Sequence, residues 1–348
     1  MHLRIPKDIR WRPTGNTLGE GGQAQVQEVE DSLGQYEGKF ALKALARGRP
    51  PQAYERFFRE VNAVKGLDHP YIVQVVDSSA PTDDFHYYVM ELVNGAKPLS
   101  KVLTTPDSPF RCDAVASLDL FIKVAEAILA CETNDPKVTH RDLSPSNILL
   151  IPDGSIRVID FGLCQVEGSE TITLIDEGVG SVNYMAPECE AGASGPIDTN
   201  SDLYSAGKIL WAAVAGQQAF AREKAAFTAK AMSKVFPECP DTWHLYHVFA
   251  KTIRHDPTTR WRSAQDAIDG ANRVKGLIQR GYPATEEVFA TCPVCGVGKL
   301  SDFPGSHTVF GNPNPRGIGS FQCDNCGVCL AIGLYVRKST LDKMKAME

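Results

Sequence analysis

Acidic and amide side chains gather in two short polar segments near the middle of the chain. Residues 140–147 read HRDLSPSN, and residues 160–162, which follow after a turn, read DFG. In such a group one aspartate can accept the proton of an attacking hydroxyl, while an asparagine and a second aspartate hold magnesium. Hard oxygen ligands suit Mg²⁺, which keeps waters and substrate phosphates as its other ligands. The order and spacing of Asp142, Asn147 and Asp160 therefore indicate chemistry on a phosphate group.

A glycine-rich turn and a lysine–glutamate pair near the N-terminus point to the same chemistry. Residues 18–26 read LGEGGQAQV, between two strand-like segments. Glycines let a backbone approach a phosphate closely, and the amide groups of the turn can line its oxygens; a plain hairpin turn would give the same pattern. Lys43 ends a short apolar strand and Glu60 lies on a predicted helix, so the carboxylate can hold the ammonium group in place for an ATP phosphate. The alternative for these two is a pair of unrelated surface charges.

Strand-like segments dominate the first part of the chain and helical segments the second. Residues 10–45 alternate short apolar runs with glycines, and apolar residues at helical spacing follow over 53–66, ending at Gly66. Beyond Pro187 the pattern is mainly helical up to about Gln279. The elements expected in between are strands at Ile72–Val76 and His86–Val93, a helix at Leu118–Cys131, and strands at 148–151 and 156–159. A β-rich part therefore precedes an α-rich part.

The bulk composition is that of a globular protein with a mild negative charge. The 348 residues are 43% hydrophobic and carry a formal net charge of -6, with no long run of one sign. This argues against electrostatic attraction of the whole chain to nucleic acid or anionic lipid, but it does not exclude a local charged patch. The apolar runs fall short of the roughly 18 residues that a membrane span needs. With no signal-peptide pattern, we expect no membrane partner and a cytoplasmic location.

Together these motifs resemble the protein kinase family over roughly residues 10–280. The resemblance implies that Lys43 contacts the ATP phosphates and that Glu60 pairs with Lys43. It also implies that Asp142 is the catalytic base and that Asn147 and Asp160 are the Mg²⁺ ligands. The residues implied to bind the nucleotide are Leu18, Gly19, Gly21, Val26, Ala41, Lys43, Met90 as the gatekeeper, Glu91 to Val93 as the hinge, and Leu149.

The resemblance also implies a fold and its boundaries. We expect an α+β, two-lobed kinase domain over 10–281, with a β-rich N-lobe at about 10–93 and an α-rich C-lobe at about 94–281. Gly281-Tyr282-Pro283 breaks the last helix and marks the domain boundary.

Motifs after the DFG segment distinguish a protein substrate from a small molecule. Residues 180–188 (GSVNYMAPE) resemble the end of a kinase activation segment, residues 202–207 (DLYSAG) resemble the helix that anchors it, and residues 256–260 (DPTTR) supply an arginine for Glu188. These are parts of a peptide-substrate platform, so we expect protein substrates. Ser181 favours transfer to serine or threonine, as does the lack of the alanine and arginine that tyrosine kinases carry after the catalytic aspartate. Autophosphorylation is expected as well.

Ser144 departs from the family pattern. Serine/threonine kinases usually keep a lysine there that touches the γ-phosphate. Its loss removes charge stabilisation of the transition state, so that either activity is reduced or another cation substitutes. The alternative function is a pseudokinase-like ATP-binding scaffold, in which a cysteine-rich module at 288–336 recruits a protein or nucleic-acid partner. Because the five catalytic residues are all present, we expect an active enzyme.

Five of the ten cysteines crowd the C-terminal part of the chain. Cys292 and Cys295, and then Cys323 and Cys326, form two CxxC motifs, each followed by glycine. Two such turns can present four thiolates to Zn²⁺ in a tetrahedron, and zinc can supply the folding free energy that so small a module lacks. The pattern resembles a zinc ribbon over 288–336, followed by a tail at 337–348; free cysteines or a redox pair are the alternative. Cys329 is a spare thiol.

The other five cysteines are scattered singly and are expected to be small buried apolar residues. They are Cys112, Cys131, Cys164, Cys189 and Cys239.

Overall fold

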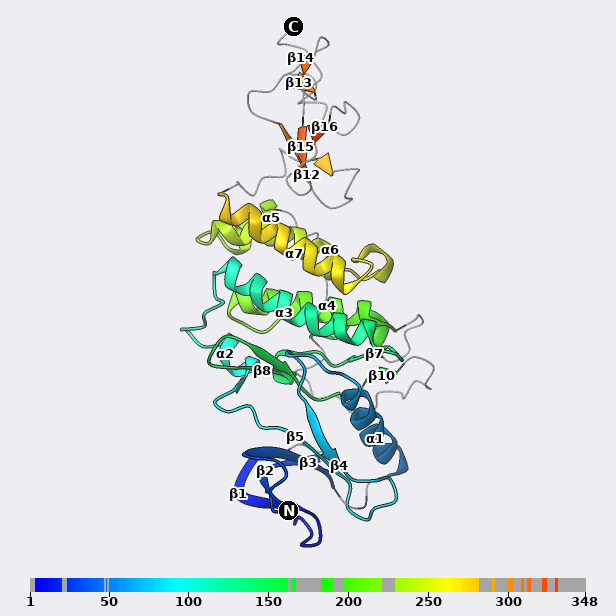
Figure 1. Ribbon diagram of the computed structural model, residues 1–348. Coiled ribbons are helices and arrows are strands. Elements are labelled where there is room, and N and C mark those ends of the chain that lie inside the picture. The colour runs from blue at the N-terminus through cyan, green and yellow to red at the C-terminus, as the bar shows by residue number, and fades with distance from the viewer. Residues whose placement is uncertain are drawn as a thin grey trace.

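The computed structural model of the chain has two lobes, an N-terminal antiparallel sheet followed by a mainly helical lobe (Figure 1). It describes residues 4–20, 24–46, 48, 50–161, 164–166, 183–190, 197–220 and 229–281, together with short strands between 290 and 330. Within the described residues, no helix is long and apolar enough to cross a membrane.

The N-lobe is built on five antiparallel strands in the order β1-β2-β3-β5-β4. The register places Lys43 opposite Tyr88 and Ala41 opposite Met90, so residues that are distant in sequence share one face of the sheet. The strands are β1 Trp11–Glu20, β2 Ala24–Asp31, β3 Lys39–Leu45, β4 Val75–Ser78 and β5 Tyr87–Glu91.

Helix α1 (Pro51–Lys65) is the one long helix described in the N-lobe and lies alongside the sheet in Figure 1. Proline in its first turn suits that position, because the first amide groups of a helix have no intrahelical partner. Phe57, Val61 and Val64 are buried at helical spacing. The helix ends at Gly66, which confirms the helix and the stop predicted over 53–66.

The C-lobe is a stack of helices in which α3 contacts α4 and α7, and α4 contacts α6 (Figure 1). Gly207 allows the close approach of α4 to α6, because an added Cβ would lie 2.2 Å from Thr252 Oγ1. The α-helices are α2 Leu99–Leu103, α3 Ala114–Thr133, α4 Thr199–Ala215, α5 Ala229–Val235, α6 Tyr246–Thr252 and α7 Ala264–Gln279. Short 3₁₀ turns occupy Pro145–Asn147, Pro187–Cys189, Pro240–Leu245 and Pro257–Thr259.

Short strands frame the polar segment 140–147 between the lobes. Strand β7 (Val138–Thr139) precedes the segment, and β8 (Ile148–Leu150) follows it and pairs with β9 (Ile156–Val158). Strand β6 (Lys97–Pro98) completes the sheet with β8, and β10 (Gln165–Val166) pairs with β7. The strands expected at 148–151 and 156–159 are therefore confirmed.

The strand expected at Ile72–Val76 is wrong in its first half, since β4 begins at Val75. Ile72 and Val73 bond to Val158 of β9 instead: Ile72 forms an isolated parallel bridge, and the Val73 amide donates to the Val158 carbonyl at 3.0 Å. Both side chains are 2% exposed. The apolar run therefore marks burial between the lobes rather than a continuous strand.

Beyond the helices, four short strands form an antiparallel sheet in the order β11-β12-β15-β16. They are β11 Ala290–Thr291, β12 Lys299–Asp302, β15 Phe321–Cys323 and β16 Cys329–Leu330, and a separate pair joins β13 Thr308–Val309 to β14 Asn312–Pro313. The tail at 337–348 lies outside the described residues.

Two of the scattered cysteines are not isolated apolar residues. Cys112 and Cys239 form a disulfide, with a Cα–Cα separation of 5.5 Å across 127 residues of sequence. This corrects the expectation for that pair, because sequence separation gives no sign of which thiols the fold brings together. Cys131, Cys164 and Cys189 are buried free thiols, as expected.

Candidate active site

The predicted lysine–glutamate pair forms in the structure. Lys43 Nζ donates to Glu60 Oε1 at 2.7 Å, joining β3 to α1. The same ammonium group donates to Asp160 Oδ1 at 3.0 Å, which joins the N-lobe to the segment after β9. Three charges that are far apart in sequence therefore meet between the two lobes.

Burial and charge act in opposite directions on this cluster. Burial by itself lowers the pKa of Lys43, but the carboxylates of Asp160 and Glu60 outweigh it, so the pKa lies well above its ordinary value. Burial raises the pKa of Glu60, and the neighbouring ammonium group of Lys43 opposes that shift. Lys43 is thus held as a cation between the two lobes.

Asp142 and Asn147 are also in contact. Asn147 Nδ2 donates to Asp142 Oδ2 at 2.9 Å and to the Asp142 carbonyl at 2.8 Å. Because Asn147 Nδ2 is used in these two bonds, the amide oxygen Oδ1 is the atom of Asn147 that can contact a cation. Asp160, whose side chain is 48% exposed, offers carboxylate oxygens. This donor set fits Mg²⁺ bound together with phosphates.

His140 contacts both this loop and the DFG segment. Its ring centroid lies 4.4 Å from that of Phe161. The Asp142 amide donates to His140 Nδ1 at 3.3 Å, so Nε2 carries the proton and donates to the Ile159 carbonyl at 3.1 Å. Asp142 is therefore positioned through its backbone as well as through Asn147.

Asp202 on α4 is a residue whose role the sequence did not reveal. Its Oδ2 accepts from the His140 amide at 2.7 Å and its Oδ1 accepts from the Arg141 amide at 2.9 Å. Burial raises the pKa of Asp202, and the contacts with His140 and Arg141 oppose that shift. Arg141 has a φ of 67°, a left-handed conformation that is rare for residues other than glycine. The carboxylate of Asp202 therefore holds the loop in a strained shape.

The residues implied to surround adenine come from both lobes. Ala41 and Met90 are buried opposite each other on β3 and β5, and Val26 and Leu149 are partly exposed. Leu18 is 44% exposed on β1, beside Gly19. Gly21 lies outside the described residues.

The expected hinge begins at Glu91, the last residue of β5, and continues through the partly exposed Val93. Glu91 Oε1 accepts from Arg157 Nε at 2.8 Å and from the Gln74 amide at 3.2 Å. The side chain therefore ties the connection between the lobes to β9.

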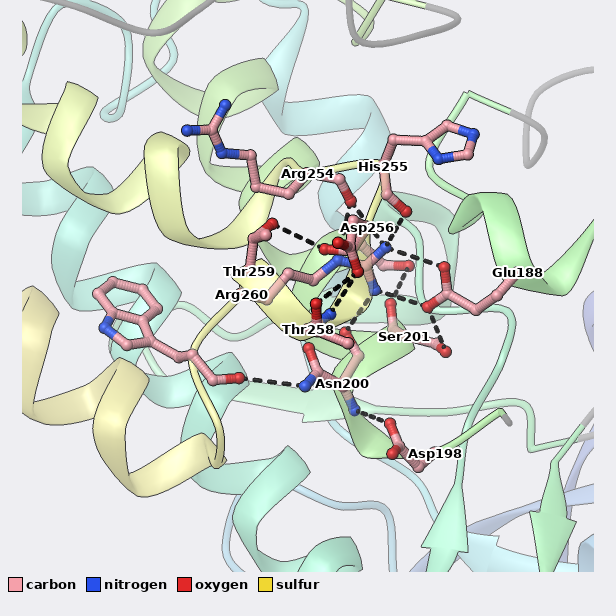
Figure 2. A network of polar contacts seen from close by, with 12 residues as sticks. Glu188, Asp198, Asn200, Ser201, Arg254, His255, Asp256, Thr258, Thr259 and Arg260 are labelled. Atoms are coloured by element: carbon pink, nitrogen blue, oxygen red, sulfur yellow. Dashed lines mark hydrogen bonds and ion pairs between the residues drawn. The ribbon is translucent and has the colours of Figure 1, made fainter. Parts of the chain in front are cut away.

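The predicted partner of Glu188 is confirmed in the C-lobe. Arg260 Nη1 and Nη2 donate to the two carboxylate oxygens of Glu188 at 2.6 and 2.9 Å, as Figure 2 shows. Ser201 Oγ donates to the same carboxylate at 2.7 Å. Burial by itself raises the pKa of Glu188, but Arg260 outweighs it and the net shift is downward. A buried two-pronged ion pair thus fixes the end of segment 183–190.

The predicted zinc ligands cannot be placed. Cys292, Cys295 and Cys326 lie outside the described residues, and of Cys323 only the backbone in β15 is described. Within the described residues, no group of three or more His, Cys, Asp or Glu side chains could hold a metal ion.

The family model described as "Protein kinase domain" matches residues 13–269. This chain belongs to the protein kinase family. The two-lobed fold and the assembled charge cluster agree with that membership.

Two bacterial proteins are among the curated relatives of this kinase. It is 30% identical to the serine/threonine-protein kinase PrkC of Bacillus subtilis over 257 residues, which are 72% of this chain and 38% of the relative. It is 31% identical to the serine/threonine-protein kinase PksC of Streptomyces coelicolor over 317 residues, which are 86% of this chain and 55% of the relative. The chain therefore spans about two fifths to just over half of these relatives.

A solved structure supports the fold. The kinase domain of Mycobacterium tuberculosis PknI superposes with a TM-score of 0.59, covering 78% of this kinase and 100% of that chain at 22% identity. At that identity the likeness supports the two-lobed fold alone.

Proposed function

We propose that this kinase transfers the γ-phosphate of ATP to serine and threonine hydroxyls of protein substrates. The observation that carries the proposal is the meeting of Lys43, Glu60 and Asp160 at 2.7 and 3.0 Å. A kinase needs both the lysine–glutamate pair and the aspartate of the DFG segment in place. The names of the bacterial relatives favour serine and threonine as acceptors.

Each polar residue of the site has a role in that reaction. Asp142 accepts the proton of the attacking hydroxyl, and Asn147 keeps the carboxylate of Asp142 oriented through its hydrogen bond. Asn147 and Asp160 would hold Mg²⁺, which when bound neutralises charge on the phosphates. Lys43 orients the phosphates of ATP, and Val26, Ala41 and Leu149 surround adenine.

A substitution of the proposed base tests the function. Asp142→Asn removes the proton acceptor but keeps the size of the side chain, so we expect the rate of phosphate transfer to fall by about 100-fold or more. The rate is measured with radiolabelled ATP and a protein acceptor. Asp153→Asn is the matched control, because Asp153 is an exposed aspartate after β8 that accepts only from the Ser155 amide among the contacts seen.

Equal rates for the Asp142→Asn variant and the wild type would contradict the assignment of the base. A wild type that binds ATP yet transfers no phosphate would favour the scaffold alternative, which the serine at position 144 motivates. That serine is 5% exposed in the structure.

We also propose that the C-terminal module binds Zn²⁺ through Cys292, Cys295, Cys323 and Cys326. The strand pairing supports this, because the first CxxC motif lies in the connection of the antiparallel pair β11/β12 and the second begins at the end of β15, whose connection leads to its partner β16. Connections between paired strands are where two CxxC motifs can face one metal ion. Such a module would offer a docking surface for a protein or nucleic-acid partner.

Metal analysis tests the module. We expect about one zinc per chain in the wild type by mass spectrometry, and loss of zinc in the double variant Cys292→Ser/Cys295→Ser. Cys131→Ala is the control, since Cys131 is a buried thiol of α3 and should leave the zinc content unchanged. Cys329→Ser shows whether the spare thiol is a ligand. Wild-type protein without zinc would refute the proposal.

A further inference from the structure

Tyr88 contacts both members of the lysine–glutamate pair. It lies on β5, opposite Lys43 of β3, and is 3% exposed. Its hydroxyl donates to Glu60 Oε1 at 2.8 Å, and Lys43 Nζ donates to the same oxygen at 2.7 Å. Lys43 Nζ also lies 5.6 Å from the centroid of the Tyr88 ring. One side chain therefore supplies a hydrogen bond to the anion and an aromatic face to the cation.

Lys43 and Tyr88 both favour the charged form of Glu60 against the effect of burial. The side chain is 3% exposed, and burial disfavours its charged form. A hydrogen bond from a hydroxyl to a buried carboxylate stabilises that form, and bonds to charged groups are among the stronger ones in proteins. Removing a donor from Glu60 should therefore make the carboxylate easier to protonate.

Helix α1 has a second contact with Tyr88. No side chain caps its N-terminus, and no acidic residue lies in its first turn. The ring of Tyr88 packs against Phe57 of α1, with centroids 5.6 Å apart. Tyr88 therefore ties β5 to the helix both by packing and by the bond to Glu60.

We infer that Tyr88 is a positioning residue, whose hydroxyl keeps Glu60 ionised and aligned with Lys43. The lysine–glutamate pair of this kinase is then a unit of three residues, with the third supplied by the strand that leads into the hinge. The catalytic consequence rests on the proposed phosphotransfer, whereas the effect on the protonation of Glu60 does not.

Tyr88→Phe isolates the hydroxyl, because the ring and its packing remain. We expect kcat/KM for phosphate transfer to fall about tenfold, mainly through kcat, as the alignment of Lys43 loosens. We also expect the acidic limb of the pH profile to move up by about one pH unit, because Glu60 loses a donor to its charged form. The groups facing Glu60 are Lys43 of β3, Tyr88 of β5, and Asp160 and Cys164 after β9.

Tyr87→Phe is the matched control. Tyr87 is the preceding residue of β5 and points to the opposite face of the sheet, where it packs in the cluster of Trp11, Val29 and Leu42. A change there also removes one tyrosine hydroxyl from a buried strand, since Tyr87 is 8% exposed. We expect it to leave the pH profile in place.

A direct titration separates this inference from the proposed function. In protein labelled with ¹³C at the glutamate carboxyl groups, the Glu60 signal is assigned by its loss in Glu60→Gln. We expect its midpoint to lie about one pH unit higher in Tyr88→Phe than in the wild type or in Tyr87→Phe. This readout needs no enzyme activity. An unchanged midpoint in Tyr88→Phe, or an equal shift in Tyr87→Phe, overturns the inference whether or not the protein transfers phosphate.

Discussion

Two buried carboxylates do different work at the centre of this kinase because their hydrogen-bond donors differ. Burial raises the pKa of both Glu60 and Asp202. Glu60 accepts hydrogen bonds from the side chains of Lys43 and Tyr88, so its charge depends on groups of two neighbouring strands. Asp202 accepts hydrogen bonds from two backbone amides, so its charged form is stabilised only while the loop keeps its conformation. The first arrangement suits a residue that orients Lys43, and the second suits a structural support.

The support from Asp202 gives a prediction at the residue scale. Asp202→Asn replaces one acceptor oxygen with an NH₂ group, which leaves a buried amide of His140 or Arg141 without its partner. We expect the free energy of unfolding to fall by about 1–3 kcal/mol in chemical denaturation.

Asp198→Asn is the control for this change. Asp198 caps the N-terminus of the same helix and accepts from the Asn200 amide, and asparagine caps helices about as well as aspartate. An Asp202→Asn variant as stable as Asp198→Asn would contradict the role of the two amide bonds.

At the scale of elements, α4 organises the C-lobe part of the site. Asp202 holds the loop 140–147 and Ser201 donates to Glu188. One turn further on, Ser205 Oγ donates to the Tyr184 carbonyl at 2.8 Å. The first two turns of one buried helix thus fix both the proposed base and the segment expected to form the substrate platform.

The disulfide links two other parts of the C-lobe. Cys112 directly precedes the N-cap of α3, and Cys239 precedes the 3₁₀ turn at Pro240–Leu245. A cross-link over 127 residues restricts the unfolded chain strongly. We expect Cys112→Ser/Cys239→Ser to lower the free energy of unfolding by on the order of 2–5 kcal/mol.

Reduction supplies the control for the disulfide. Dithiothreitol should lower the stability of the wild type toward that of the double variant and leave the double variant unchanged. If the denaturation midpoint of the wild type is the same with and without the reductant, the disulfide does not stabilise the fold. Disulfides are rare in reducing compartments, and the cytoplasmic location stays a prediction.

At the scale of the molecule, the residues that the sequence revealed are those that belong to motifs of recognisable order and spacing. HRDLSPSN carries Asp142 and Asn147, which the structure joins by a hydrogen bond, whereas Asp160 of DFG is bonded to the distant Lys43. The strands and helices that carry them follow from apolar periodicity, which is a local signal.

The contacts that the sequence did not reveal depend on register and packing over long distances. The bond from Tyr88 to Glu60 spans 28 residues and depends on which residue of β5 lies opposite Lys43. The bond from Asp202 to His140 spans 62 residues and depends on how α4 packs beneath the loop. A single sequence specifies neither the register of distant strands nor the rotation of a buried helix, so these roles required the structure.

Phosphate transfer is the central claim, and it rests on the contacts of Lys43 with Glu60 and Asp160. Its most direct test is phosphosite mapping by mass spectrometry after wild type and Asp142→Asn are each incubated with ATP and Mg²⁺ and an added protein acceptor. We expect phosphoserine and phosphothreonine, without phosphotyrosine, in the wild-type reaction and a near absence of new sites with Asp142→Asn. Wild type that adds no phosphate, or a variant that adds as much as the wild type, would contradict the account.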